Sequence, residues 1–156
     1  MKALSLMPCW ADAVFWGEKT IEARTWKTDY RGDLLICASS RKQSGYIPGK
    51  AICVVTLTDI EPFGPQHCKA AGMEPDEMPN KPSYAWHFED VQWVEPFDVK
   101  GKLHLFDVPD EEIWLIDPPK NETEMRKVLR EYFLPHVYIA RDDDLGRDFW
   151  EEVTKE

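Results

Sequence analysis

Three charged side chains at close spacing are the residues of this sequence best suited to do chemistry. Lys19, Glu22 and Arg24 follow Gly17 in a stretch whose alternating pattern predicts an extended strand over residues 19–26. Successive side chains of a strand point to opposite faces, so Glu22 and Arg24 would share one face and Lys19 the other. An ammonium, a carboxylate and a guanidinium in one place can bind the polar edge of a nucleobase or transfer protons in a hydrolysis. The ordinary alternative is a surface strand with cross-strand ion pairs.

Aromatic residues accompany this charged segment along the chain. Trp10 precedes it and Trp26 ends it, while Ser39, Tyr84 and Trp86 lie further on. Stacking of a base on an aromatic ring contributes about 1–3 kcal/mol, so a small aromatic pocket can bind a nucleic-acid ligand without a long basic groove. We therefore expect a pocket in which Trp86 or Trp10 stacks on a base while the carboxylate and the guanidinium bind its edge.

The charge distribution restricts the class of ligand. The formal net charge of the 156 residues is -10, and it is uneven. Residues 1–58 carry eight Lys and Arg against five Asp and Glu, whereas residues 59–156 carry eleven against twenty-four. Coating of nucleic acid without regard to sequence needs many cations to neutralise phosphates. We expect instead a short ligand bound by the first part of the chain, with the acidic C-terminal part as an alternative surface for a protein partner.

Composition predicts a single globular domain in a reducing compartment. With 43% hydrophobic residues, a chain of this length can bury a sizeable core without disulfides. The four cysteines form no C-x-x-C pair, and no signal segment precedes the first residues, so we expect reduced thiols and a cytoplasmic location. No uncharged apolar run approaches the roughly 20 residues of a membrane helix. The four histidines share no ligand spacing, and we expect no metal and no cofactor.

The periodicity of apolar residues predicts an α+β fold. Short strands are expected at 3–7, 19–26, 34–38, 51–60, 84–96 and 102–108, with a hairpin turn at 99–102 between the last two. Helical spacing predicts a first helix that begins at Pro8, a second over 123–134 and a third over 145–153, with Asp144 as its N-cap. Several short strands with helices at their edges predict a small closed or nearly closed barrel, whose mouth would bind a ligand.

Six short motifs follow one another in consistent order over residues 3 to about 108. They are Ala3-Leu4-Ser5-Leu6 with Pro8 and Trp10-Ala11, Gly17-x-Lys19-Thr20-Ile21-Glu22-x-Arg24, Tyr30-Arg31-Gly32-x-Leu34-Leu35-Ile36-x-Ala38-Ser39, Gly49-Lys50-Ala51-Ile52, Tyr84-Ala85-Trp86 and Val99-Lys100-Gly101-Lys102-Leu103. Together they resemble the ASCH domain, a PUA-like barrel related to the YTH and PUA RNA-binding folds. The resemblance implies that residues 1–108 form the barrel and that residues 109–156 are a helical extension packed on the same domain.

The ASCH resemblance also implies a ligand and a site. Members of the family are expected to bind RNA or a modified nucleoside in a cleft between the barrel and the first helix, which Lys19, Glu22 and Arg24 would line. With the accompanying polar and aromatic residues, the expected ligand-binding set is Trp10, Lys19, Glu22, Arg24, Ser39, Tyr84 and Trp86.

Enzymatic relatives supply the alternative function, a hydrolase acting on RNA or on an acylated nucleoside. The relatives that act on acetylcytidine use a lysine, a threonine and a distant glutamate, and Glu22 stands here at the threonine position. A carboxylate does not replace a hydroxyl nucleophile, so this departure argues against that chemistry. Ribonuclease relatives depend on lysine and tyrosine. If the chain is an enzyme, Lys19, Glu22 and Lys50 are the expected catalytic residues.

Overall fold

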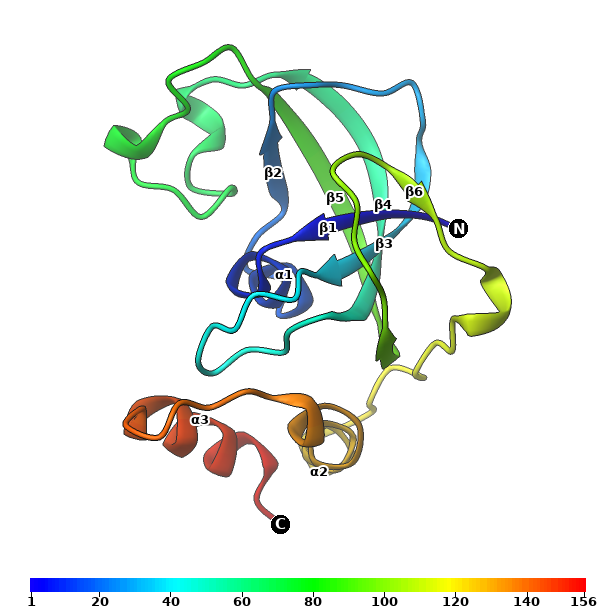
Figure 1. The fold of residues 1–156 in the computed structure, drawn as a ribbon, viewed down its shortest axis with the longest axis vertical. Helices are drawn as coiled ribbons and strands as arrows, with labels where there is room; N and C mark the ends of the chain where they lie inside the picture. Colours follow the sequence, from blue (N-terminus) through cyan, green and yellow to red (C-terminus); the bar gives the residue numbers. More distant parts are fainter.

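A single six-stranded mixed sheet and three α-helices form the fold of the computed structural model, which describes residues 1–156 (Figure 1). The strands are β1 Lys2–Leu6, β2 Ile21–Arg24, β3 Gly32–Ala38, β4 Lys50–Pro62, β5 Tyr84–Asp98 and β6 Phe106–Asp107, and the helices are α1 Pro8–Phe15, α2 Glu122–Val128 and α3 Asp144–Thr154. The strand order is β2-β5-β4-β3-β1-β6; only β1 and β3 run parallel. The predicted α+β class and the six strands are confirmed.

The sheet is strongly curved but it does not close into the predicted barrel. Strand pairing leaves β2 and β6 as edges, with four and two residues respectively. Edges this short have few backbone groups with which to pair. A side chain bridges part of the gap instead, because the Arg24 guanidinium on β2 donates to the Ser5 carbonyl of β1 at 2.8 Å.

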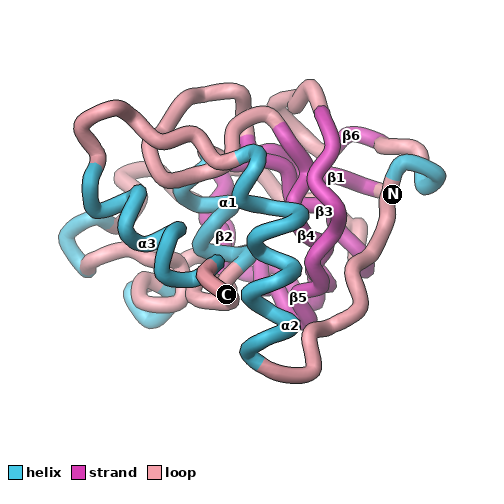
Figure 2. The backbone as a smooth tube through the Cα atoms, turned by 90° about the horizontal axis from the view of Figure 1, so that it is seen from below, coloured by secondary structure: helices cyan, strands magenta, loops and turns pink.

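Apolar residues on both faces of β3 hold the sheet between two cores. Leu34 and Ile36 belong to the larger core with α1, whereas Leu35 and Cys37 belong to a smaller core with β6. A strand buried on both faces reads in sequence as a continuous apolar run, as the 34–38 segment does. Figure 2 shows the three helices gathered on one side of the strands.

The C-terminal residues pack on the larger core. Leu129, Phe133 and Trp150 are members of it, and the Trp150 indole donates to the Gly45 carbonyl at 2.8 Å. The helix predicted over 123–134 continues beyond α2 as a π-helix, Leu129–Phe133, and ends in a 3₁₀ turn, Leu134–His136. Three further 3₁₀ turns lie at Pro65–His67, Pro75–Glu77 and Asp110–Glu112.

Two local predictions are corrected. Residues 99–102 do not turn a hairpin, because β6 pairs with β1 rather than with β5 and only two residues of the predicted 102–108 strand are extended in the sheet. The N-cap of α3 is Asp143, whose carboxylate accepts from the Gly146 amide at 2.9 Å. None of the helices combines the length and apolar character that crossing a membrane requires.

Candidate functional site

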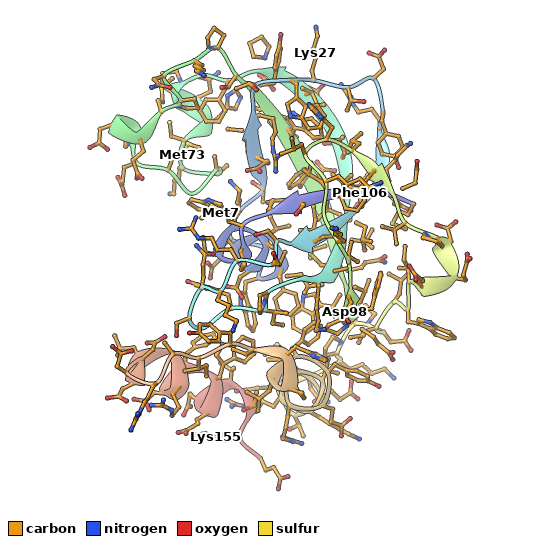
Figure 3. All side chains as sticks on the ribbon, in the orientation of Figure 1. Met7, Lys27, Met73, Asp98, Phe106 and Lys155 are labelled. Carbon is orange, nitrogen blue, oxygen red and sulfur yellow. The ribbon has the colours of Figure 1, made fainter.

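A cleft of about 840 Å³ opens between the ends of β1 and β2, the start of α1 and the segment after β5. The charged residues that line it are Lys19, Glu22, Arg24, Lys100 and Lys102, so four cations surround a single carboxylate. The other lining residues are Ser5, Leu6, Met7, Trp10, Ala23, Thr25, Trp26, Ser39, Ser40, Met73, Val99, Gly101 and Leu103. Met7 and Met73 lie on the same side of the molecule in Figure 3. The cleft is therefore a cationic region in a protein of net charge -10.

Glu22 is the centre of the charged group in the cleft. Its Oε1 lies 3.4 Å from the Lys19 ammonium, and its Oε2 accepts from Arg24 Nε at 3.0 Å and lies 2.9 Å from Arg24 Nη2. The Glu22 side chain is only 11% exposed, so little water screens these pairs. The two cations and one carboxylate leave a net positive charge within this group.

Lys19 reaches the cleft because the chain bends before β2. The strand begins at Ile21, two residues later than predicted, and the amides of Thr20 and Ile21 both donate to the Ala70 carbonyl. The Lys19 ammonium donates to the Ala71 carbonyl at 2.6 Å and lies 4.9 Å from the centre of the Trp10 ring. Burial lowers the pKa of Lys19, and the charge and hydrogen bond of Glu22 oppose part of that effect.

Two indoles stand on the lining of the cleft, and other residues fix both. Trp10 carries the Lys19 ammonium on its face and packs against Gly72, where an added Cβ would lie 3.1 Å from the ring. Trp26 makes T-shaped contacts with the buried Trp86 and with the exposed His104, in each case with ring centres 4.8 Å apart. Both cleft indoles stay partly exposed, so each offers ring surface to a planar ligand.

The lysines of the 99–103 segment reach the cleft because the backbone there approaches β1 closely. An added Cβ at Gly101 would lie 2.8 Å from the Ser5 Cβ, a distance that side chains do not tolerate. Lys100 and Lys102 are exposed and form no ion pair. Their ammonium groups are therefore available to an anionic ligand in the cleft.

The structure brings together five of the expected site residues and separates the other three. Trp10, Lys19, Glu22, Arg24 and Ser39 line the cleft; Tyr84, Trp86 and Lys50 do not.

The expected stacking role of Trp86 is corrected, because its side chain is fully buried and its indole donates to the Trp26 carbonyl. Tyr84 does not line the cleft; the Lys27 ammonium lies over its ring, 5.5 Å from the ring centre. Lys50 pairs with Asp98 between β4 and β5, so the expected catalytic trio of Lys19, Glu22 and Lys50 is not assembled.

Sequence reasoning left Trp26, Lys100 and Lys102 out of the site. A signal for Trp26 was present, because the alternation of an extended chain puts it on the face that carries Glu22 and Arg24. The two lysines had no such signal, since the 99–102 stretch has the composition of an ordinary turn.

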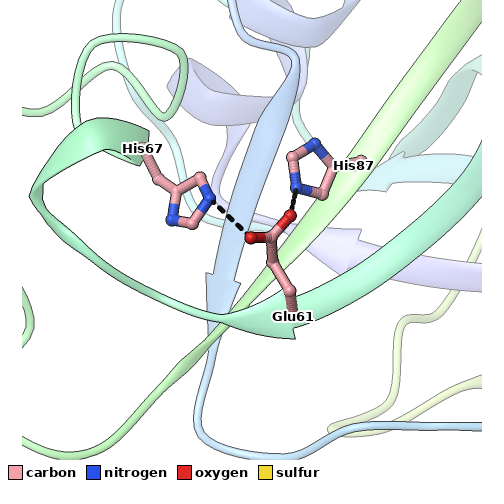
Figure 4. A group of neighbouring side chains, drawn as sticks. All are labelled: Glu61, His67 and His87. Atoms are coloured by element: carbon pink, nitrogen blue, oxygen red, sulfur yellow. Dashed lines mark hydrogen bonds and ion pairs between the residues drawn. The ribbon is translucent and has the colours of Figure 1, made fainter.

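A second polar cluster joins β4, β5 and the 3₁₀ turn at Pro65–His67. Figure 4 shows Glu61 between two imidazoles, with its oxygens 3.3 Å from His67 Nε2 and 2.8 Å from His87 Nε2. His67 Nδ1 accepts a hydrogen bond from the Gly64 amide, so the neutral ring carries its proton on Nε2 and donates it to Glu61. To bind a metal ion, His67 would need an unprotonated Nε2. The cluster therefore serves to anchor residues 63–83, which supply the Ala71 carbonyl that Lys19 binds.

Comparison with known proteins identifies the fold and the family. The open six-stranded mixed sheet with three helices is consistent with a PUA-like fold, and the ASCH domain model matches residues 4–101. The chain belongs to the ASCH domain family, which is linked to RNA binding.

Solved structures share this fold at low sequence identity. The ASCH protein from Zymomonas mobilis is 17% identical with a TM-score of 0.56, and the match covers 71% of this chain and 89% of that one. Two mutants of the same protein match with TM-scores of 0.57 at 18% and 17% identity, covering 71% of this chain and 89% and 91% of theirs. No curated protein matches the sequence.

Proposed function

We propose that this protein binds a short single-stranded RNA or a modified nucleoside in the cleft between β1, α1 and β2. The observation that carries the proposal is the presence of two partly exposed indoles, Trp10 and Trp26, in the same cleft as the Lys19, Glu22 and Arg24 group. Any of the nucleobases can stack on an indole face, whereas fixed polar groups discriminate among the edges of the bases. Membership in the ASCH family supports the same ligand class.

The charges of the cleft favour a ligand with one or two phosphates. Lys100 and Lys102 lie on the cleft lining and are exposed without anionic partners, so they can neutralise one or two phosphates. Each phosphate that a cation neutralises on a single strand adds about -0.7 to the slope of log affinity against log salt concentration. A slope between about -0.7 and -1.4 is therefore expected. Its magnitude is much smaller than that of a protein that coats RNA.

Titration of labelled RNA tetranucleotides and of modified nucleosides tests this proposal. Trp26→Ala should weaken binding by about tenfold through loss of stacking, and Lys102→Ala should reduce the salt slope by about 0.7. Trp114→Ala and Lys120→Ala are matched controls, because both residues are exposed and lie outside the cleft. Unchanged affinity in Trp26→Ala, with an unchanged melting temperature, would contradict the proposal.

A hydrolase is the second candidate, and one observation favours it. Burial lowers the pKa of Lys19, which is the direction that a general base requires. The hydrogen bond from the Lys19 ammonium to the Ala71 carbonyl and the remote position of Lys50 favour binding over turnover. Incubation of labelled RNA with the wild type and with Lys19→Met separates the two. Cleavage by the wild type alone would establish a hydrolase, and equal cleavage by both proteins would indicate a contaminant.

A further inference from the structure

A second cavity, of about 530 Å³, lies between α1, the segment 44–46 and α3. It shares no lining residue with the cleft. One wall comes from α3 and its N-cap, which lie beyond the residues 4–101 that the family model matches. The cavity is therefore completed by a part of the chain that the family match does not cover.

Aromatic rings form the apolar surface of this cavity. Trp16, the C-cap of α1, and Phe149 on α3 stand edge to face, with ring centres 6.0 Å apart and planes at 86°. Trp150 lies behind them, fixed by its hydrogen bond to the Gly45 carbonyl, with its ring centre 5.6 Å from that of Phe149. Phe149 is 46% exposed although it borders a cavity, so part of its ring has no apolar cover.

Every charged residue that lines the cavity is acidic. Asp12, Glu18 and Asp143 are among its lining residues, no Lys, Arg or His is, and none of the three acids forms an ion pair. Hydrogen bonds from Ser44 and Gly146 lower the pKa of Asp143, so this residue is ionised at neutral pH. The sign of charge is opposite to that of the cleft and excludes a phosphate ligand.

The three acids do not form the compact group that a single metal ion needs. A single ion needs at least three ligand atoms close together, and the three carboxylates do not form such a group; only Glu61, His67 and His87 do. Indole and phenyl faces bind organic ammonium groups through cation–π contacts, whereas they offer no ligand atom to a metal. A cavity of this volume is also in the range of small-molecule sites.

We propose that the cavity between α1 and α3 binds an aliphatic polyamine, with ammonium groups at Asp12, Glu18 and Asp143 and with the alkyl chain against Trp16 and Phe149. A ligand with more than one ammonium group matches this lining, because three acidic side chains without cationic partners line one space. Burial raises the pKa of Asp12 to about 7, and the charge of Glu18 adds to that effect, so a bound cation would relieve both costs. This site is independent of the nucleic-acid cleft and of the function proposed there.

Calorimetric titration of the full chain with 1,4-diaminobutane and spermidine tests the proposal, with butylamine and Mg²⁺ at matched ionic strength as comparison ligands. Saturable binding is expected for the two polyamines, with butylamine at least tenfold weaker and Mg²⁺ without competition. Asp12→Asn should weaken diaminobutane binding about tenfold and Glu18→Gln about threefold, since charge-assisted bonds are lost.

Glu95→Gln, an exposed acid on β5 outside the cavity, should leave diaminobutane affinity unchanged. Glu18 is itself exposed, so Glu18→Gln tests the site without a risk to folding. Three results would overturn the proposal: no saturable polyamine binding, equal affinity for butylamine and diaminobutane, or equal affinity in wild type, Asp12→Asn and Glu18→Gln.

Discussion

Arg24 and Ser5 join two strands that share no backbone pairing. The guanidinium Nη2 of Arg24 on β2 donates to the Ser5 carbonyl of β1 at 2.8 Å, while Nε of the same side chain donates to Glu22 at 3.0 Å. One side chain thus links β2 to β1 where the sheet remains open and also orders the carboxylate at the centre of the cleft. The same side chain therefore contacts the charged group of the cleft and the open part of the sheet.

Arg24→Lys should destabilise the protein although it conserves the charge. A lysine ammonium lacks the planar fork that reaches Glu22 and the Ser5 carbonyl together, so one of the two contacts is lost. We expect the free energy of unfolding, measured in urea, to fall by about 1–2 kcal/mol. Arg31→Lys is the control, because Arg31 is exposed and bonds only to loop carbonyls. Equal stability of Arg24→Lys and wild type would show that the bridge is not needed.

Glu22→Gln should cost more, because it leaves two cations in the cleft without their carboxylate. Loss of one partner from a buried pair costs roughly 3 kcal/mol, through the uncompensated charge that remains. Urea unfolding measures the loss. Adding Lys19→Met to Glu22→Gln should recover part of it, since the second substitution removes the more deeply buried cation. A double variant that is less stable than Glu22→Gln would rule out this electrostatic explanation.

Gly101→Ala should disturb the wall that carries the cleft lysines. The added methyl group would lie 2.8 Å from the Ser5 Cβ, so the 99–103 segment must move away from β1. Overpacking of this kind costs about 1–3 kcal/mol, which a thermal melt would detect. Ser5→Gly in the same chain should restore the melting temperature, because it removes the atoms that the methyl group meets. No recovery would place the strain elsewhere.

Asp12→Asn should change the pH dependence of stability in a direction that the raised pKa fixes. With the folded-state pKa near 7 against an ordinary value of 3.8, the folded protein holds a proton that the unfolded chain has released between these pH values. The contribution of Asp12 to the free energy of unfolding of the wild type therefore decreases as the pH rises through that window. The stability advantage of Asp12→Asn should grow from pH 4 and level off above about pH 7, reaching on the order of 2–4 kcal/mol. A constant difference at pH 4 and pH 8 would contradict it.

Local patterns were sufficient to predict much of the fold. The apolar run of β3 and the start of α1 at Pro8 follow from residues adjacent in the sequence. The open state of the sheet did not follow from sequence, because it depends on the shortness of β2 and β6 and on a contact between Ser5 and Arg24 that a local pattern does not contain. The pairing of β6 with β1 is likewise a contact over about a hundred residues.

In the candidate site too, local sequence predicted some features, whereas long-range contacts determine the others. Charge type and spacing singled out Lys19, Glu22 and Arg24, which contact one another in the structure. Alternation placed Trp26 on the face of Glu22 and Arg24, but the burial of Trp86 could not be predicted from sequence, because it results from three-dimensional packing. Lys100 and Lys102 were missed because their approach to the cleft rests on the absence of a side chain at Gly101.

Binding of a nucleobase in the cleft can be followed through the indole N–H resonances of the ¹⁵N-labelled protein during titration with a short single-stranded RNA. Trp10 and Trp26 line the cleft, whereas Trp16 lines the other cavity and Trp114 is 66% exposed outside both. We expect saturable shifts of the Trp10 and Trp26 signals, with the Trp16 and Trp114 signals unchanged. Shifts that spare Trp10 and Trp26, or no shift at saturating RNA, would contradict it.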